Sequence, residues 1–268
     1  MKFFPYFYRA FCVVILLSVT ANAQATKKTN TSQLPFIPGE TLTYEAKISK
    51  IIRGIAVADL IFSLPEKLDP GNMLVRAEAR SKGTLLKIAR YSFLQEIEST
   101  IGLQDFRVLK TVKHDVQKDR VRNSEALFDY GERRVTYTET DPREPARPPR
   151  RIASEVQGPA HDLVSAIYSL RLRPLAVGRK FTVQVSDSGL VYEVPVRVTA
   201  REMQKSVIGN VMCFRLEPVV FGPGRLIEQE GSMVLWLTDD ARRVPVRAQV
   251  NAPMGRIEIK LKSAKNLK

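Results

Sequence analysis

The sequence has little of what most catalytic and metal sites need. Its 268 residues include only 2 cysteines and 2 histidines. Two cysteines are too few for a disulfide scaffold or a cysteine-rich metal site. The sequence also lacks a nucleophile elbow, a phosphate-binding P-loop and a glycine-rich dinucleotide motif. We therefore expect no cofactor and no metal, and we do not expect an enzyme.

Long apolar runs are also absent. The apolar stretch from Phe11 to Val19 is far shorter than the ~20 residues that cross a bilayer, which disfavours the alternative of an uncleaved anchor. It follows a basic start and precedes the triplet Ala21-Asn22-Ala23. This order is typical of a secretory signal peptide over residues 1–23, with cleavage between Ala23 and Gln24. No cysteine stands at the cleavage point, so we expect a periplasmic protein and not a lipoprotein.

The segment after the predicted cleavage point, residues 24–34, is polar and shows no apolar period, so it is predicted to be a flexible leader. Beyond it, no stretch approaches ~18 continuous apolar residues. We expect no transmembrane segment in the mature chain. Residues 35–264 are expected to form a single β-rich domain.

Acidic residues are scarce relative to basic ones. The chain has 42 Lys and Arg against 28 Asp and Glu, a formal net charge of +14. Removal of Lys2 and Arg9 with the signal peptide lowers this to +12. The basic residues are spread over the chain without the aromatic clusters of a nucleic-acid interface, so we expect no nucleic-acid partner. In an envelope compartment, such a surplus favours anionic lipid or polysaccharide.

Alternation with a period of two residues dominates the domain, as in strands with one wet and one buried face. In 41–49, Leu42, Tyr44, Ala46 and Ile48 share one face. Near the C-terminus, apolar Ile257, Ile259 and Leu261 alternate with Arg256, Glu258, Lys260 and Lys262. Short polar turns separate the strands and favour hairpins. The sequence therefore predicts a mainly β fold, either a large curved antiparallel sheet or a half-open barrel.

Helical patterns are few. Residues 159–171 place Leu163, Ile167 and Leu170 on one stripe, with Pro159 and Asp162 suited to the first turn. This range is the predicted main helix. A second, shorter helix is predicted at about 84–91 on a weaker pattern.

The segment 141–151 holds four prolines and four arginines in eleven residues. Proline at this density favours a loop that cannot join a β ladder. One hypothesis makes it a basic arm that meets an anionic partner through Arg143, Arg147, Arg150 and Arg151. The alternative, which we favour, is a solvated loop whose charges have no binding role.

Three residues could carry catalysis in principle. His114 follows the parity of apolar neighbours in a predicted strand, so we expect a packed or half-buried structural histidine. His161 stands at the start of the predicted helix, where we expect it to be exposed. Cys213 lies between Met212 and Phe214 and is expected to be a buried free thiol. Neither histidine has a partner at zinc-ligand spacing.

Three stretches together resemble the exported bacterial family catalogued as domain of unknown function 3108. They are Gly39-Glu40-Thr41-Leu42-Thr43-Tyr44, the run from Asp162 to Arg171, and the run from Trp236 to Val246. The resemblance covers about residues 35–262 and implies no activity or catalytic residue. The chain also looks like the half-barrels of the lipoprotein-carrier superfamily, at the level of the fold alone. The motif positions are Gly39, Tyr44, Asp162, Ser165, Tyr168, Arg171, Trp236, Asp240, Arg243 and Pro245.

Three hypotheses for the function follow. The first is a non-enzymatic envelope protein that binds a lipid or other amphiphile in a cavity against the sheet; it requires an apolar cavity of several hundred cubic ångströms at positions such as Leu42, Tyr44 and Ile48. The second is a structural or assembly partner of another envelope protein, with a packed interior. The third is an enzyme of unrecognised type, in which His114 or His161 would meet a carboxylate or Cys213.

Overall fold

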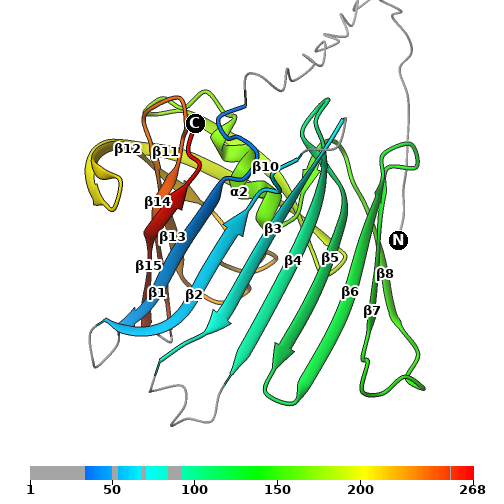
Figure 1. The fold of residues 1–268 in the computed structure, drawn as a ribbon. Coiled ribbons are helices and arrows are strands. Elements are labelled where there is room, and N and C mark those ends of the chain that lie inside the picture. The colour runs from blue at the N-terminus through cyan, green and yellow to red at the C-terminus, as the bar shows by residue number, and fades with distance from the viewer. Residues whose placement is uncertain (1–33, 50–53, 68–70, 84–91, 254) are drawn as a thin grey trace, which may run out of the picture.

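The computed structural model describes residues 34–49, 54–67, 71–83, 92–253 and 255–268, and these form one curved sheet and one helix (Figure 1). The first eight strands are β1 (Thr41–Ser49), β2 (Ile55–Ser63), β3 (Asn72–Ser81), β4 (Phe93–Gly102), β5 (Arg107–Gln117), β6 (Arg120–Asp129), β7 (Arg134–Thr140) and β8 (Arg150–Glu155). After β9 (Ala160–His161) comes the helix α2 (Leu163–Arg171). The remaining strands are β10 (Lys180–Asp187), β11 (Leu190–Ser206), β12 (Gly209–Pro218), β13 (Ser232–Thr238), β14 (Pro245–Ala252) and β15 (Gly255–Lys265).

The strand order is linear. It runs β8-β7-β6-β5-β4-β3-β2-β1-β15-β14-β13-β12-β11-β10-β9, so two meanders meet where β1 pairs with β15. Neighbours are antiparallel except β9 and β10, which pair in parallel through Ala160 and His161. Because β8 and β9 are the ends of the order, the described sheet is not closed. The prediction of a large curved antiparallel sheet is confirmed, with this one parallel pair.

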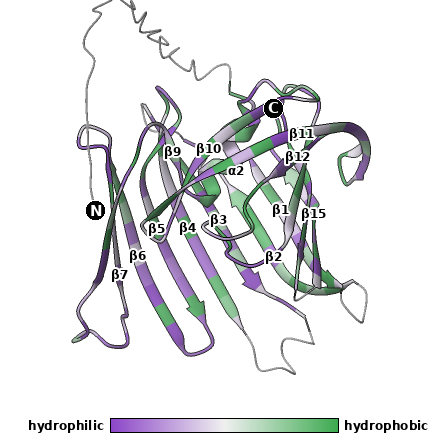
Figure 2. Ribbon diagram, turned by 180° about the vertical axis from the view of Figure 1, so that it is seen from behind, coloured by the Kyte–Doolittle hydropathy of each residue, from purple (hydrophilic) through white to green (hydrophobic). Residues whose placement is uncertain are grey.

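The helix α2 lies inside the curve of the sheet (Figure 2). One side of it packs Val164 and Tyr168 against Met73 and Val75 of β3. Its other side packs Leu170 against the apolar cluster of β10 to β13. The helix therefore fills the space between the two meanders. Hereafter, the inner face of the sheet is the face toward α2. None of the helices among the described residues is long and apolar enough to cross a membrane.

The helix begins later than predicted. Ala160 and His161 pair with β10, and Asp162 has an extended backbone, so the helix starts at Leu163 and not at 159. His161 was expected to be exposed; this was wrong, since it is only 3% exposed. The cause is the strand pairing, which turns the segment toward the interior of the sheet before the helix starts. The second predicted helix, 84–91, lies outside the described residues.

The boundaries of two other predicted segments change. Arg150 and Arg151 belong to strand β8, opposite Glu139 and Thr138, so the loop of the β7–β8 hairpin covers 141–149 only. All four prolines of the segment lie in this loop, as expected for residues without a backbone donor. Leu34, assigned to the flexible leader, is 2% exposed and packs in a core cluster. The predicted signal peptide and the rest of that leader lie outside the described residues.

A buried ion pair ties three distant segments to the end of α2. The guanidinium of Arg171 donates to both carboxylate oxygens of Glu40, at 2.5 and 2.8 Å. It also donates to the carbonyl oxygens of Pro35 (3.2 Å) and Arg242 (3.1 Å). Both side chains are almost fully buried. The segment before β1, the helix and the turn between β13 and β14 therefore meet at one cation.

We expect the Arg171→Met variant to lose about 3–5 kcal/mol of unfolding free energy, because it leaves the Glu40 carboxylate buried without its partner. The double variant Arg171→Met, Glu40→Gln should lose less than the sum of the two single variants. Urea denaturation followed by circular dichroism measures both. The exposed Arg179→Met is the control and should change stability by under about 0.5 kcal/mol. A loss below about 1 kcal/mol for Arg171→Met would contradict the assignment.

Candidate functional site

The motif positions of α2 hold the helix in place. The Asp162 carboxylate accepts hydrogen bonds from the backbone amides of Val164 (3.0 Å) and Ser165 (2.7 Å), and Ser165 Oγ accepts from the Asp162 amide (2.9 Å). This reciprocal arrangement is a capping box. The carboxylate also accepts from the hydroxyls of Ser99 and Thr111, on β4 and β5. Asp162 thus fixes the start of the helix to the inner face of the sheet.

The remaining motif positions stabilise turns and contacts. Asp240 accepts from the Thr238 hydroxyl (2.7 Å) and from the amide of Arg243 (3.2 Å), which has a left-handed backbone with φ of 49°. The Tyr44 hydroxyl donates to the carbonyl oxygen of Pro245 at 2.8 Å. Each of these contacts is internal. Gly39 (φ 78°) accepts a hydrogen bond from Asn266 through its carbonyl oxygen, and Tyr168 packs edge-on against Phe36.

The space inside the sheet is small. Leu42 and Tyr44, which the cavity hypothesis would place along a ligand, are 2% and 6% exposed and pack in a core cluster. A hollow of about 30 Å³ lies beside the start of α2, with Lys113, Asp162 and Asp187 in its wall. A volume of this size holds about one water molecule. Thr111 and Ser124 also line this hollow, and such polar side chains do not suit an acyl chain.

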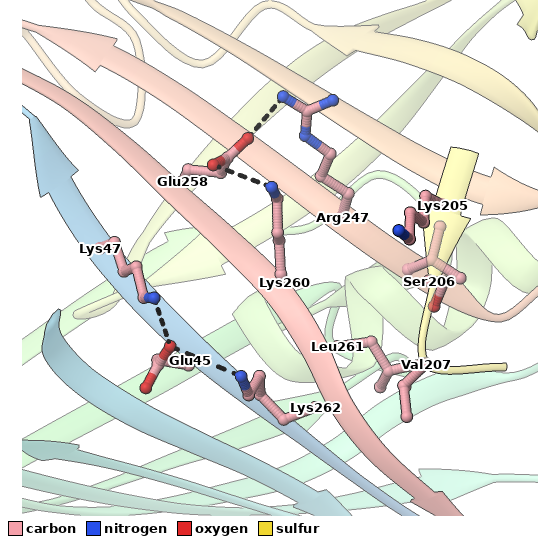
Figure 3. Close-up of a pocket in the computed structure, with 11 residues that line it drawn as sticks. Glu45, Lys47, Lys205, Ser206, Val207, Arg247, Glu258, Lys260, Leu261 and Lys262 are labelled. Carbon is pink, nitrogen blue, oxygen red and sulfur yellow. Dashed lines mark hydrogen bonds and ion pairs between the residues drawn. The ribbon is translucent and has the colours of Figure 1, made fainter. Parts of the chain in front are cut away.

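A much larger hollow lies on the outer face of the sheet. This groove has a volume of about 540 Å³ and is formed by β1, β14, β15 and the turn of the β11–β12 hairpin (Figure 3). We call it the basic groove. Its lining residues are Glu45, Lys47, Lys205, Ser206, Val207, Val246, Arg247, Glu258, Lys260, Leu261 and Lys262.

The alternation of β1 and β15 places the charges there. Glu45 is paired across the strands with Lys260, and Lys47 with Glu258, so four charged side chains project outward from adjacent positions. Five cations and two carboxylates line the basic groove. The sequence predicted that Lys260 and Lys262 share the wet face of their strand, and this is confirmed.

Each carboxylate is shared by several cations. Glu45 lies 3.1 Å from Lys47 and 2.9 Å from Lys82, and its pKa is lowered to about 2, chiefly by the hydrogen bond from Lys82. Glu258 lies 2.5 Å from Arg247 and 3.2 Å from Lys260. Burial raises the pKa of Glu258, but these two cations outweigh it and lower the pKa overall. Both carboxylates are therefore ionised at neutral pH, and the basic groove keeps a net positive charge.

The β11–β12 hairpin covers one side of the basic groove. We call residues 201–212 the flap. Its alternate residues face the sheet: Glu202 accepts from Trp236 Nε1 at 2.5 Å, and Gln204 accepts from Arg247 at 3.2 Å. The Arg247 guanidinium lies 4.6 Å from the centre of the Trp236 ring. Trp236 is therefore packed under the flap, as expected for a large aromatic, and sits beside a cation of the groove.

Sequence analysis did not predict the flap. In the sequence, apolar residues alternate with others from Tyr192 to Val198, whereas β11 continues to Ser206. In the structure, exposed and half-buried residues go on alternating through Lys205, but residues 201–205 are polar apart from Met203 and give no apolar period in the sequence. Nothing in the local pattern indicates that the hairpin folds over β13 and β14.

The four arginines proposed as a basic arm lie elsewhere. They belong to the β7–β8 hairpin, at one end of the strand order, far from the pairing of β1 with β15. Arg143 donates to the carbonyl oxygen of Asp119, and Arg147 pairs with Glu144 at 3.8 Å. Arg150 and Arg151 are exposed on β8. The structure does not bring these residues to the basic groove.

The candidate catalytic residues are not connected to one another by any described interaction. His114 lies on the outer face, because a register shift between Thr100 and Ile101 changes which residues of β5 face inward, and it hydrogen-bonds to Asn123 at 2.6 Å. It is half-buried, as expected. Cys213 is fully buried and its thiol contacts the carbonyl oxygen of Val211. The described residues contain no cluster of His, Cys, Asp and Glu that could hold a metal.

Comparison with known proteins identifies the family. Residues 43–262 match the family described as Protein of unknown function (DUF3108). The chain belongs to the DUF3108 family. Among curated proteins, none matches it significantly. The match of this DUF3108 chain begins in β1 and ends in β15, so it includes α2, the basic groove and the flap.

A solved structure shows the same fold at low identity. The DUF3108 chain is similar to a β-barrel-like protein of domain of unknown function DUF1849 from Brucella abortus, with a TM-score of 0.56, 8% identity, and coverage of 86% of this chain and 98% of that one. A candidate exported protein with a YmcC-like fold from Bacteroides fragilis NCTC 9343 matches with a TM-score of 0.36, 11% identity, and coverage of 87% and 98%. A candidate lipoprotein from Parabacteroides distasonis ATCC 8503 matches with a TM-score of 0.33, 9% identity and the same coverage.

Burial of His161 predicts an acid-sensitive fold. Burial lowers its pKa to about 4, against the opposing effect of Asp162 and with the help of Arg173. Between about pH 6.5 and 4 the unfolded chain binds a proton at this residue that the folded chain does not, so stability falls as the pH falls. In this window we expect the free energy of unfolding to fall by about 1 kcal/mol for each pH unit. Urea denaturation of the wild type and of His161→Gln measures it; equal slopes for the two proteins would contradict the prediction.

Burial also predicts an unreactive Cys213. It raises the pKa of the thiol to about 12, with smaller contributions from Asp240 and Glu202. In the chain without residues 1–23, Cys213 is the one cysteine. We expect almost no reaction with Ellman's reagent at pH 8 in the native protein, because the thiolate is the reacting species, and one equivalent in denaturant. Rapid stoichiometric reaction of the native protein would show that the thiol is accessible.

Proposed function

We propose that this protein is an exported, non-enzymatic protein of the cell envelope that binds an anionic, phosphate-bearing envelope component in the basic groove. The observation that carries the proposal is the composition of the groove, in which five cations surround two carboxylates. Both carboxylates are already engaged by lysine or arginine side chains. An added anion would therefore meet a net positive charge and no free carboxylate to repel it.

Two unpaired donors in the groove support an oxyanion as the ligand. Arg247 Nε and Ser206 Oγ are buried and have no hydrogen-bond partner. A buried polar group without a partner is costly, and such groups in native proteins call for an explanation. Both residues line the basic groove, one from β14 and one from the flap. A phosphate held in the groove would satisfy these covered donors after a small movement of the side chains over them, and charge-assisted bonds to arginine are among the strong ones.

The packed interior favours a binding site on the surface and not in an internal cavity. The first hypothesis from the sequence required an apolar cavity of several hundred cubic ångströms, and the hollow beside α2 measures about 30 Å³. A packed interior is what the second hypothesis, an assembly partner of another envelope protein, requires. Both that partner and a lipid headgroup would bind on the outer face, so the experiment must separate them.

Export and a non-enzymatic role are parts of the proposal that sequence features support. The order of basic start, apolar run and Ala-Asn-Ala triplet in residues 1–23 supports export and cleavage by signal peptidase. The proposal assigns no catalytic residue. Cys213 is buried with a raised pKa, and His161 is buried beside the aspartate that caps α2.

The test uses Trp236, the single tryptophan of the chain. Its fluorescence should change when an anion binds Arg247, which lies against the ring. The probe is dihexanoyl phosphatidic acid below its micellar concentration, with dihexanoyl phosphatidylcholine as the zwitterionic comparison. We expect saturable binding of the phosphatidic acid, weakened by salt. The triple variant Lys47→Gln, Lys260→Gln, Lys262→Gln should bind about tenfold more weakly, at about 0.5 kcal/mol for each exposed charge.

The matched control removes the same number of charges elsewhere. The triple variant Arg143→Gln, Arg147→Gln, Arg150→Gln changes the β7–β8 hairpin and should bind like the wild type. Equal weakening in both variants would show that net charge and not the groove is responsible. Absence of binding by the wild type would overturn the phosphate proposal and leave the assembly partner, to be sought by crosslinking in intact cells.

A further inference from the structure

The flap carries apolar side chains that packing does not explain. Met203 is 58% exposed and Val207 is 56% exposed, whereas most large apolar side chains of the described chain are buried or half-buried. Met203 is on the side of the hairpin that faces away from the sheet, while Val207 follows Ser206 at the turn, beside the basic groove, with Lys205 between the two. The even-numbered positions bind Trp236 and Arg247 instead.

The flap projects beyond the sheet. Strand β12 pairs with β13 only from Cys213 to Leu216, while β11 and β12 pair with each other from Val196 and Pro218 to Ser206 and Gly209. The residues of the hairpin beyond Cys213 therefore have only each other as strand neighbours. Figure 1 shows the hairpin extending past the edge of the other strands. The side-chain contacts to Trp236 and Arg247 hold it against the outer face of β13 and β14, and they leave Met203 and Val207 exposed.

Basic side chains surround this projecting tip. Lys205 is in the flap, and Lys47, Lys260 and Lys262 line the opposite wall of the same groove. Val207 lines the groove as well and stands near Leu261 (Figure 3). Apolar groups that project among lysines are typical of a surface that lies on an anionic bilayer, where the apolar groups enter the headgroup region and the ammonium groups meet phosphates.

We propose that the flap tip docks on the surface of a bilayer that contains anionic phospholipid, with Met203 and Val207 in the headgroup region and a lipid phosphate in the basic groove. This inference rests on the proposed function, because the groove supplies the electrostatic part of the contact. It adds the source of the phosphate, which is a lipid held in a bilayer and not a soluble molecule. The positive charge of the groove is complementary to the anionic headgroups, and the exposed apolar side chains of the tip suit the headgroup region.

The experiment measures the fraction of the protein that sediments with vesicles at low salt. The vesicles contain equal amounts of phosphatidylglycerol and phosphatidylcholine. The variant Met203→Ser, which changes an exposed flap residue outside the groove lining, should lose about fivefold in vesicle partitioning and keep the wild-type affinity for monomeric dihexanoyl phosphatidic acid. Val177→Ser is the control, since this apolar residue is 56% exposed elsewhere on the surface. It should partition like the wild type.

The outcomes separate the two proposals. Unchanged partitioning of the flap variant would overturn bilayer docking by the tip, and the groove would still stand if the soluble phosphatidic acid binds. Unchanged binding of the soluble probe by the groove variant Lys47→Gln, Lys260→Gln, Lys262→Gln would instead overturn the proposed function. Both variants change side chains that project to solvent, and circular dichroism with the urea midpoint confirms that each one is folded.

Discussion

The buried ion pair between Arg171 and Glu40 is the contact on which the arrangement of the fold depends. Removing two charges from water is expensive, and attraction alone often fails to compensate. Here the guanidinium also meets two backbone carbonyl oxygens and the rings of Phe36 and Tyr168. These partners come from the segment before β1, from α2 and from the turn after β13. The cost of burying the charge is offset only when all three segments are in place. The ion pair therefore favours one position of the helix on the sheet.

This docking decides where a ligand can bind. With Arg171 and Asp162 holding its two ends, α2 occupies the curve of the sheet and leaves a hollow the size of a water molecule. Without the helix, the apolar clusters of β3 and of β10 to β13 that pack against it would be uncovered. The same fold class can therefore host a carrier or a protein with a closed interior, and the side chains at the helix ends distinguish them. In this chain the available concave surface is on the outer face.

The local pattern of the sequence predicts strands and faces but not how distant strands meet. Alternation in β1 and β15 correctly assigned Tyr44 inward and Lys260 outward, because the period of two is a property of the backbone. The prediction that His161 is exposed at the start of the helix was wrong, because pairing with β10 buries the residue. The local pattern also did not predict the flap, which depends on contacts of Glu202 and Gln204 with two strands more than thirty residues away. The resemblance marked Arg171 and Asp162 as motif positions. Only the structure showed that their role is to hold the helix.

The basic groove keeps its positive charge because of how its carboxylates are arranged. A single glutamate opposite each lysine would neutralise the charge of the groove, and exposed ion pairs of this kind contribute little to stability. Glu45 and Glu258 are instead each surrounded by several cations, which lowers their pKa values and orients the lysines without balancing them. The repulsion among the cations is a cost to the free protein that an incoming phosphate would relieve. An arrangement of this kind is more stable with an anion bound than without one, which is the physical reason for assigning a binding role to this surface.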